Sequence, residues 1–89
     1  MVALSVVEGG AAQAWTYAPA QVTTTLGTTL TWTNAGAEDH TVTSDDRTSF
    51  DSRNISPHAT FSFTPTTAGT FAYHCAYHPW MKGTITVTQ

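Results

Sequence analysis

Threonine and apolar residues alternate along much of the chain. In the segment QVTTTLGTTLTWTN, residues 21–34, Leu30 and Trp32 alternate with threonines, and the segments TFSFT (60–64) and TITVT (84–88) repeat the pattern. A period of two, carried by β-branched and aromatic residues, is typical of half-buried strands. We find no stretch with helical periodicity, so the sequence predicts an all-β protein.

Glycine, proline and asparagine divide this pattern into short pieces. The expected strands cover about residues 2–8, 14–18, 21–25, 29–33, 40–44, 60–64, 70–75 and 83–88. Short strands at this spacing favour an antiparallel sandwich or barrel, and the polar stretch 44–56 is expected to be a loop with one short edge strand. Two sheets packed face to face would bury Leu30, Trp32, Phe61, Phe63, Phe71, Tyr73, Ile85 and Val87.

The length of 89 residues indicates a single domain spanning residues 1–89, because domains commonly run from about 50 to 250 residues. We find no linker and no internal repeat. Small domains sometimes depend on a disulfide or a metal. Cys75 is the only cysteine, which excludes a disulfide within one chain and makes a metal the expected additional support.

Charge and hydropathy exclude two classes of partner. The net charge is -3 and lysine plus arginine total three, so no basic patch for nucleic acid can form. No run of about 18 apolar residues suggests a membrane span. The opening MVALSVVEGG has no signal-peptide pattern. We expect a mature domain whose export signal has been removed, located in the periplasm or outside the cell.

The segment FAYHCAYHPWMKG, residues 71–83, concentrates side chains that bind metals. If the alternation continues through it, Cys75 lies at the inner end of a core strand. His78 and Met81 follow at three-residue intervals on a loop that can fold back over the sulfur. His40, in AEDHTVT, lies where a loop enters a strand and is the candidate second imidazole, although from the residues alone another histidine can take its place.

A thiolate, two imidazoles and a thioether suit copper in an electron-transfer role, because this mixed set accommodates both Cu(I) and Cu(II). Zinc also binds cysteine and histidine, but a thioether is a poor zinc ligand. A buried cysteine on its own is more often a small core residue. The spacing of Cys75, His78 and Met81 favours the metal site.

Three segments resemble the small cupredoxins, the blue copper proteins of the amicyanin and plastocyanin type. HCAYHPWMKGTITV (74–87) resembles their copper-ligand loop. YAPAQVTTTLGTTLTWTNAGAEDHTV (17–42) and FDSRNISPHATFSFTPTTAGTFAYHC (50–75) resemble the preceding strands. The resemblance implies a Greek-key β-sandwich of about seven or eight strands that carries one type-1 copper ion.

By this resemblance, the copper ligands are His40, Cys75, His78 and Met81, with Met81 in the axial position. The chain departs from the family at Thr41, where asparagine usually follows the first histidine. We expect the Thr41 hydroxyl to take over its role beside the ligands, tying the two ligand loops together and tuning the thiolate through hydrogen bonds.

The other histidines and two tryptophans have simpler interpretations. His74 precedes the cysteine, a position where some copper enzymes bind a second copper, but we expect a partly exposed strand residue. His58 is expected at the surface. Trp15 and Trp32 are expected to be core or sheet-face residues.

The resemblance implies a monomeric electron carrier that is not an enzyme. Tyr77, Pro79 and Trp80 flank His78 and would form an apolar ring on which redox partner proteins dock. Four acidic residues near the ligands would either steer a basic partner or form a merely solvated loop: Glu38, Asp39, Asp45 and Asp46.

Three alternatives to the electron carrier remain open. The first is a copper storage or delivery module, and the second is a domain cut from a larger copper oxidoreductase. A metal-free sandwich used for binding is the third, and it leaves the His-Cys-His-Met pattern unexplained.

Overall fold

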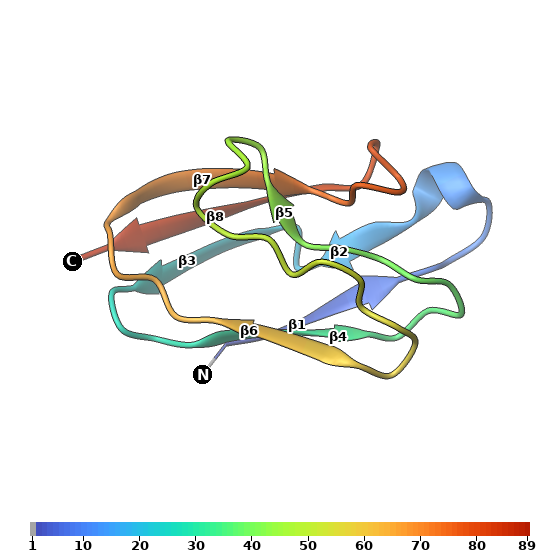
Figure 1. Cartoon of the computed structure of the whole chain (residues 1–89), viewed down its shortest axis with the longest axis horizontal. Coiled ribbons are helices and arrows are strands. Elements are labelled where there is room, and N and C mark those ends of the chain that lie inside the picture. Colours follow the sequence, from blue (N-terminus) through green and yellow to red (C-terminus); the bar gives the residue numbers. More distant parts are fainter. Residues whose placement is uncertain (1) are drawn as a thin grey trace.

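A computed structural model describes residues 2–89 of the chain. Within this range, eight strands form two four-stranded sheets packed face to face (Figure 1). The elements are β1 (Val2–Val7), a 3-10 turn η1 (Ala12–Ala14), β2 (Thr16–Ala18), β3 (Gln21–Thr25), β4 (Leu30–Asn34), β5 (Thr43–Ser44), β6 (Thr60–Phe63), β7 (Gly69–His74) and β8 (Lys82–Thr88). The prediction of an all-β sandwich with about seven or eight strands is confirmed.

The strand bounds agree with the sequence pattern except at two places. The predicted strand 14–18 begins with the η1 turn and is extended only over Thr16–Ala18. The predicted strand 40–44 is reduced to Thr43–Ser44, an edge strand that pairs with β7. Both shortened strands border the loops at one end of the sandwich, and in place of a longer strand residues 40–43 make isolated backbone bridges to residues 51–55.

The sheets are mixed, so the expected antiparallel pairing is confirmed for only some of the strand pairs. The strand orders are β2-β1-β4-β6 and β3-β8-β7-β5, and the pairs β1–β4 and β3–β8 run parallel. From β2 to β7 the chain passes to the opposite sheet at every connection. Sheet neighbours are therefore distant in sequence, and alternation alone does not fix their relative direction.

The core contains most of the residues that the pattern predicts. Leu30, Trp32, Tyr73, Ile85 and Val87 are buried, as expected. Three phenylalanines expected in the core are only partly buried against it: Phe61, Phe63 and Phe71. The reason is their position, because β6 is an edge strand and the short β5 leaves the flank of β7 beside Phe71 uncovered.

The polar segment 44–56 contributes two core residues that its composition did not indicate. Phe50 and Ile55 are buried, and Ile55 forms a backbone bridge with His40. This segment therefore supports one of the candidate ligands. The segment is otherwise a loop, as expected, but the edge strand expected within it is reduced to Ser44 at the end of β5 and isolated bridges at Asp51 and Ile55.

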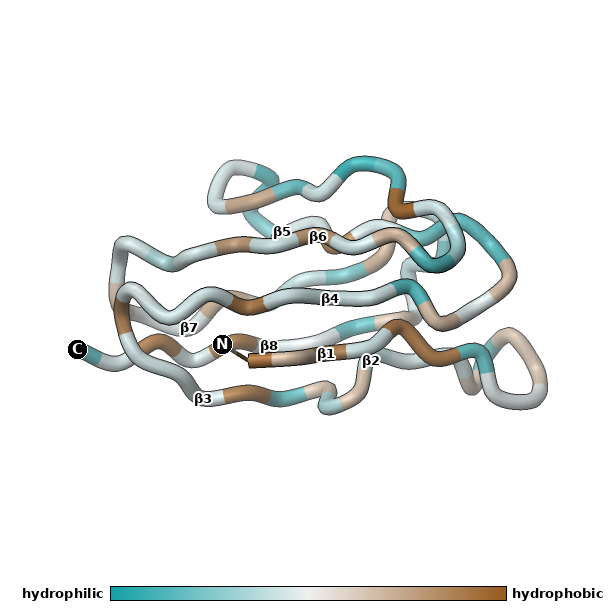
Figure 2. The backbone as a smooth tube through the Cα atoms, turned by 90° about the horizontal axis from the view of Figure 1, so that it is seen from below, coloured by the Kyte–Doolittle hydropathy of each residue, from teal (hydrophilic) through white to brown (hydrophobic). Residues whose placement is uncertain are grey.

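Several connecting loops gather at the end of the sandwich opposite both termini (Figures 1 and 2). They include the loop after β1, the loop after β4 and the loop between β7 and β8. The candidate ligands lie at this end. In the described residues, no helix is both long and apolar enough to cross a membrane.

Candidate metal centre

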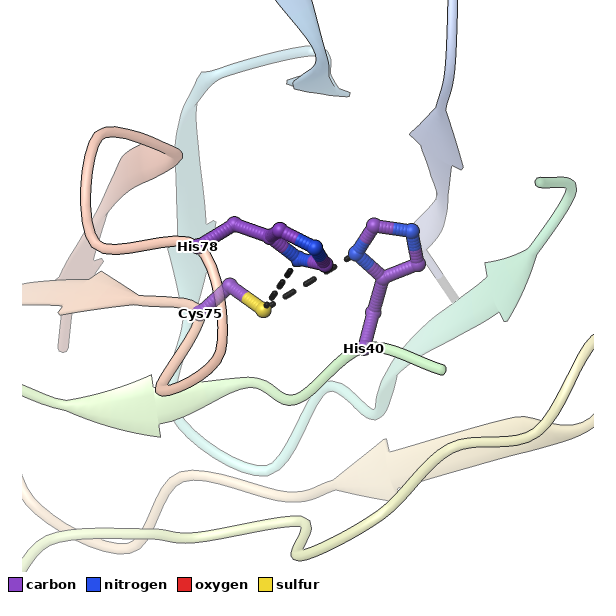
Figure 3. A group of neighbouring side chains, drawn as sticks. All are labelled: His40, Cys75 and His78. Carbon is purple, nitrogen blue, oxygen red and sulfur yellow. Dashed lines mark hydrogen bonds between the residues drawn. The ribbon is translucent and has the colours of Figure 1, made fainter. Parts of the chain in front are cut away.

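Side chains from two distant parts of the chain meet at the loop end of the sandwich (Figure 3). Cys75 directly follows β7, His78 lies in the next turn, and His40 comes from the loop before β5. The Cys75 Sγ is 3.8 Å from Nδ1 of His40 and 3.5 Å from Nδ1 of His78. One donor atom from each of the three residues lies within 4.8 Å of the others.

These separations fit a shared metal ion. First-row metals lie about 2.0–2.3 Å from imidazole nitrogen and thiolate sulfur, so donors to one ion are typically about 3.5–4 Å apart. Cys75 and His40 are fully buried, which provides the water-poor setting of a closed metal site. The soft thiolate combined with imidazole nitrogens suits copper in both of its common oxidation states.

Met81 completes a compact turn with two of these residues. The N–H of His78 donates to the carbonyl of Cys75, and the N–H of Met81 donates to the carbonyl of His78. The N–H of Cys75 donates in turn to the carbonyl of Met81 at 3.1 Å. The Met81 side chain is buried. His40, Cys75, His78 and Met81 are thus positioned to bind a copper ion.

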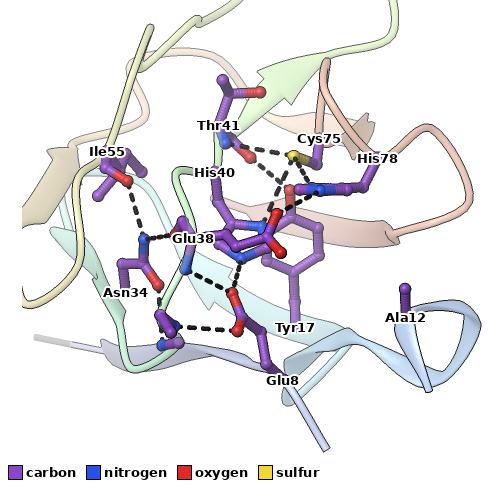
Figure 4. A network of polar contacts seen from close by, with 12 residues as sticks. Glu8, Ala12, Tyr17, Asn34, Glu38, His40, Thr41, Ile55, Cys75 and His78 are labelled. Carbon is purple, nitrogen blue, oxygen red and sulfur yellow. Dashed lines mark hydrogen bonds and ion pairs between the residues drawn. The ribbon is translucent and has the colours of Figure 1, made fainter. Parts of the chain in front are cut away.

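Thr41 joins the two ligand loops through its hydroxyl, as expected, and Figure 4 shows its backbone contact with Cys75. Its Oγ1 accepts a hydrogen bond from the N–H of Ala76 at 2.7 Å. The contact with the sulfur comes instead from its backbone N–H, which the sequence did not single out and which donates to the Cys75 Sγ at 3.4 Å. Hydrogen bonds to a thiolate stabilise its negative charge and tune the metal that it binds.

Glu8 contacts His40 and was not found from the sequence. Its Oε2 lies 2.6 Å from Nε2 of the buried imidazole. Partial burial acts to raise the pKa of Glu8, but hydrogen bonds from the Ala37 N–H, the His40 ring and the Glu38 N–H outweigh it, so the pKa is lowered. Glu8 stands 32 residues before His40, and no local pattern links them.

Trp15 is partly buried against the core, as expected, and it also packs on the candidate ligands. It is half-buried, and its ring meets the rings of His40 and His78 edge-on, at centroid distances of 5.8 and 5.1 Å. Trp32 is in the core as predicted. No local sequence pattern indicated that Trp15 contacts the candidate ligands.

His78 lies near the surface, among exposed aromatic residues. Its side chain is 13 % exposed, whereas Tyr77 and Trp80 are 51 % and 44 % exposed. The ring centroid of Trp80 is 5.4 Å from that of His78, and the Trp80 Nε1–H donates to the carbonyl of Ala12. An open hollow beside His78 is lined by Ala37, Glu38, Asp39, Asn54, Tyr77 and His78.

The remaining histidines lie outside the donor group, as expected. His74 is partly buried, and its Nδ1 is 2.7 Å from the Asp45 carboxylate rather than facing the donors. His58 is exposed, with φ of 71°. Among residues 2–89, the metal-binding cluster of histidine, cysteine and acidic residues comprises only His40, Cys75 and His78.

The acidic residues differ in whether their carboxylates have hydrogen-bond or ion-pair partners. The Asp46 carboxylate accepts hydrogen bonds from Ser49, Thr48 and Ser44, which lower its pKa, the Ser49 hydroxyl having the largest effect. Asp45 pairs with His74. Glu38 is mostly exposed, with Oε1 3.5 Å from Nε2 of His78. Asp45 and Asp46 therefore hold local structure, and Glu38 faces solvent beside the candidate ligand.

Comparison with protein families matches the chain to the cupredoxin-like domain over residues 4–87. No curated protein matches the chain in sequence. The family match begins in β1 and ends in β8, so it reaches every strand and includes all the candidate ligands.

Solved structures agree with this match. A purple cupredoxin from Nitrosopumilus maritimus superimposes with a TM-score of 0.87 at 27 % identity, covering 99 % of this chain and 100 % of that one. The Cu(I) form of a methionine-to-alanine mutant of amicyanin gives a TM-score of 0.83 at 25 % identity, covering 98 % of this chain and 81 % of amicyanin. The oxidised state of a proline-to-alanine mutant of amicyanin gives the same four values.

Proposed function

Because this chain belongs to the cupredoxin family, we propose that it is a type-1, or blue, copper protein that shuttles single electrons between redox partners. The observation that carries the proposal is the convergence of Cys75 with His40 and His78 at the loop end of the sandwich. The neighbouring amicyanin structure, described as a Cu(I) form, supports copper as the metal.

In this proposal His40, Cys75, His78 and Met81 would hold the copper ion. Bound copper supplies one-electron chemistry between Cu(I) and Cu(II). The residues around it keep the donors in one arrangement: Thr41 joins the two ligand loops, and the backbone turn from Cys75 to Met81 fixes their spacing. A site that changes little between oxidation states transfers electrons with a small reorganisation cost.

The exposed edge of His78 is the proposed exit for the electron. Tyr77, Pro79 and Trp80 surround it with exposed, largely apolar surface. A surface of this kind suits brief contacts with redox partner proteins. Glu38 and Asp39 line the adjoining hollow, and their charge favours a partner with a basic rim. We propose that the protein acts as a monomeric single domain in the periplasm or outside the cell.

A storage or delivery module is the second candidate. Such a protein exposes ligands from which copper can be passed on, whereas here Cys75, His40 and Met81 are buried and His78 is nearly so. This burial favours the electron carrier, and we propose that the protein is not itself an enzyme. A domain of a larger copper oxidoreductase would use the same site as an electron relay.

The deciding experiment adds Cu(II) to the purified protein and records its visible and EPR spectra. We expect an intense thiolate-to-copper band and a small copper hyperfine splitting, both lost in Cys75→Ser. A colourless protein, or colour that survives in Cys75→Ser, contradicts the proposal. Reversible one-electron voltammetry then separates a carrier from a storage protein, which has no need of fast electron exchange.

A further inference from the structure

We propose that Glu8 is a positioning residue for the copper site, which fixes the tautomer and orientation of His40. The inference rests on the proposed copper function. Glu8 comes from the segment after β1, and its carboxylate reaches the side of the imidazole that faces away from Cys75 (Figure 4).

The two nitrogens of His40 have different partners. Nδ1 faces the Cys75 Sγ at 3.8 Å, and Nε2 is 2.6 Å from Oε2 of Glu8. An ionised carboxylate only accepts hydrogen bonds, and in a neutral imidazole one nitrogen carries the proton. Nε2 is therefore the donor, and Nδ1 keeps the lone pair that a metal requires.

The Glu8 carboxylate is itself held in a defined position. The N–H of Ala37 donates to Oε1 at 2.9 Å, and the N–H of Glu38 donates to Oε2 at 3.0 Å. The Glu8 side chain is only 11 % exposed. Because both oxygens are held by the backbone of the loop that leads to His40, the carboxylate cannot rotate freely away from the imidazole.

Gly36 provides the space for this carboxylate. A Cβ at Gly36 would collide with Cδ and Oε2 of Glu8. The φ angle of Gly36 lies outside the left-handed region, so alanine is compatible with its backbone. Glycine at this position therefore serves the contact with Glu8, and Gly36→Ala would displace Glu8 while leaving both Glu8 and His40 in the chain.

This arrangement has two chemical consequences for a bound metal. A carboxylate that accepts from the far nitrogen of a ligating imidazole increases the basicity of the near nitrogen and holds the ring in place. Its negative charge also favours the more highly charged oxidation state. Glu8 should therefore strengthen copper binding and lower the reduction potential.

A simpler alternative is that Glu8 only clamps the loop backbone at Ala37 and Glu38. The two roles are separated by comparing Glu8→Ala and Gly36→Ala with Glu38→Ala. Glu38 is the matched control, because it is a glutamate near Nε2 of the other histidine but at 3.5 Å and mostly exposed. A loop clamp affects stability, whereas a positioning residue also affects the His40 tautomer.

The experiment records long-range ¹H–¹⁵N spectra of the histidines in the metal-free protein, then measures copper affinity by chelator competition and the reduction potential. We expect an Nε2–H tautomer for His40 in the wild type and in Glu38→Ala. In Glu8→Ala and Gly36→Ala we expect mixed tautomers, copper binding weaker by about 10–100-fold, and a raised potential.

Unchanged tautomer and affinity in both variants would overturn the inference, and a lower melting temperature alone would assign Glu8 to the clamp role. If Glu8→Ala fails to fold, Gly36→Ala tests the inference instead, because it displaces the Glu8 carboxylate without removing any polar group. If the wild type binds no copper, the proposed function fails, while the spectra of the metal-free protein still decide whether Glu8 fixes His40.

Discussion

The two imidazoles of the copper site lie in opposite surroundings. On the buried side, comprising Glu8, Asn34, His40 and Thr41, the His40 ring is fully buried and long-range hydrogen bonds fix the backbone. On the exposed side, comprising Tyr77, His78, Pro79 and Trp80, the neighbours of His78 face solvent.

The difference indicates that the two sides have different roles: the buried side holds the ligands in place, and the exposed side is available to a partner. On the buried side, polar groups satisfy one another, so a substitution leaves unpaired groups where water has little access. On the exposed side, water can replace a lost contact, and the apolar surface remains available for a partner. We expect substitutions on the buried side to change the free energy of unfolding and the spectrum of bound copper. Substitutions on the exposed side should change the rate of electron exchange with another protein molecule.

The largest effect is expected at Asn34. Its Nδ2 donates to the carbonyls of Glu38 and Ile55, and its Oδ1 accepts from the Gly36 N–H. Asn34→Ala leaves these groups without their partner and should lower the free energy of unfolding by about 3 kcal/mol. Urea denaturation of the metal-free protein measures this.

Asn54→Ala is the control for Asn34→Ala, because Asn54 contacts Tyr77 of the exposed side. The Asn54 side chain accepts from the Tyr77 hydroxyl at an exposed position, so its loss should cost less than about 0.5 kcal/mol. Equal losses at the two asparagines would contradict the contrast between the two sides.

An intermediate effect is expected at Thr41. Thr41→Val keeps the shape of the side chain and the backbone N–H that reaches Cys75, but removes the acceptor for the Ala76 N–H. The free energy of unfolding should fall by about 1–2 kcal/mol, and the thiolate-to-copper band should shift because one of the two hydrogen bonds between Thr41 and the Cys75 loop is lost. Thr41→Ser should restore both, and a Thr41→Val protein with wild-type stability and spectrum would refute the role of the hydroxyl.

The smallest effect on stability is expected at Tyr77. Tyr77→Glu should change the free energy of unfolding by less than about 0.5 kcal/mol, because the side chain is half exposed. The added charge should slow electron self-exchange between two copies about tenfold at low ionic strength. NMR line broadening in mixtures of oxidised and reduced protein measures the rate.

Added salt should reverse much of the slowing in Tyr77→Glu, since it screens the repulsion between the two copies. A self-exchange rate that matches the wild type at low salt would mean that electrons leave by another face. The same substitution on a distant face, Thr23→Glu on β3, should leave the rate near that of the wild type.

The local pattern of the sequence determined most of the strands and three of the four proposed copper ligands. Alternation predicted the strands because side chains of an extended chain point to opposite faces, whatever the partner strand. The interval from Cys75 to His78 and Met81 predicted a ligand loop because hydrogen bonds within that segment close the turn. His40 was a candidate from its place before a strand, and the family resemblance selected it over the other histidines.

The tertiary structure alone decided which distant residues support the site. The direction of the β1–β4 pair, the burial of Phe50 and Ile55, and the contacts of Glu8 and Trp15 with the histidines all join segments far apart in the chain. No local periodicity encodes such contacts, because they depend on the order in which the chain crosses between the sheets. Glu8 reaches His40 because β1 and β4 end side by side at the same end of the sandwich.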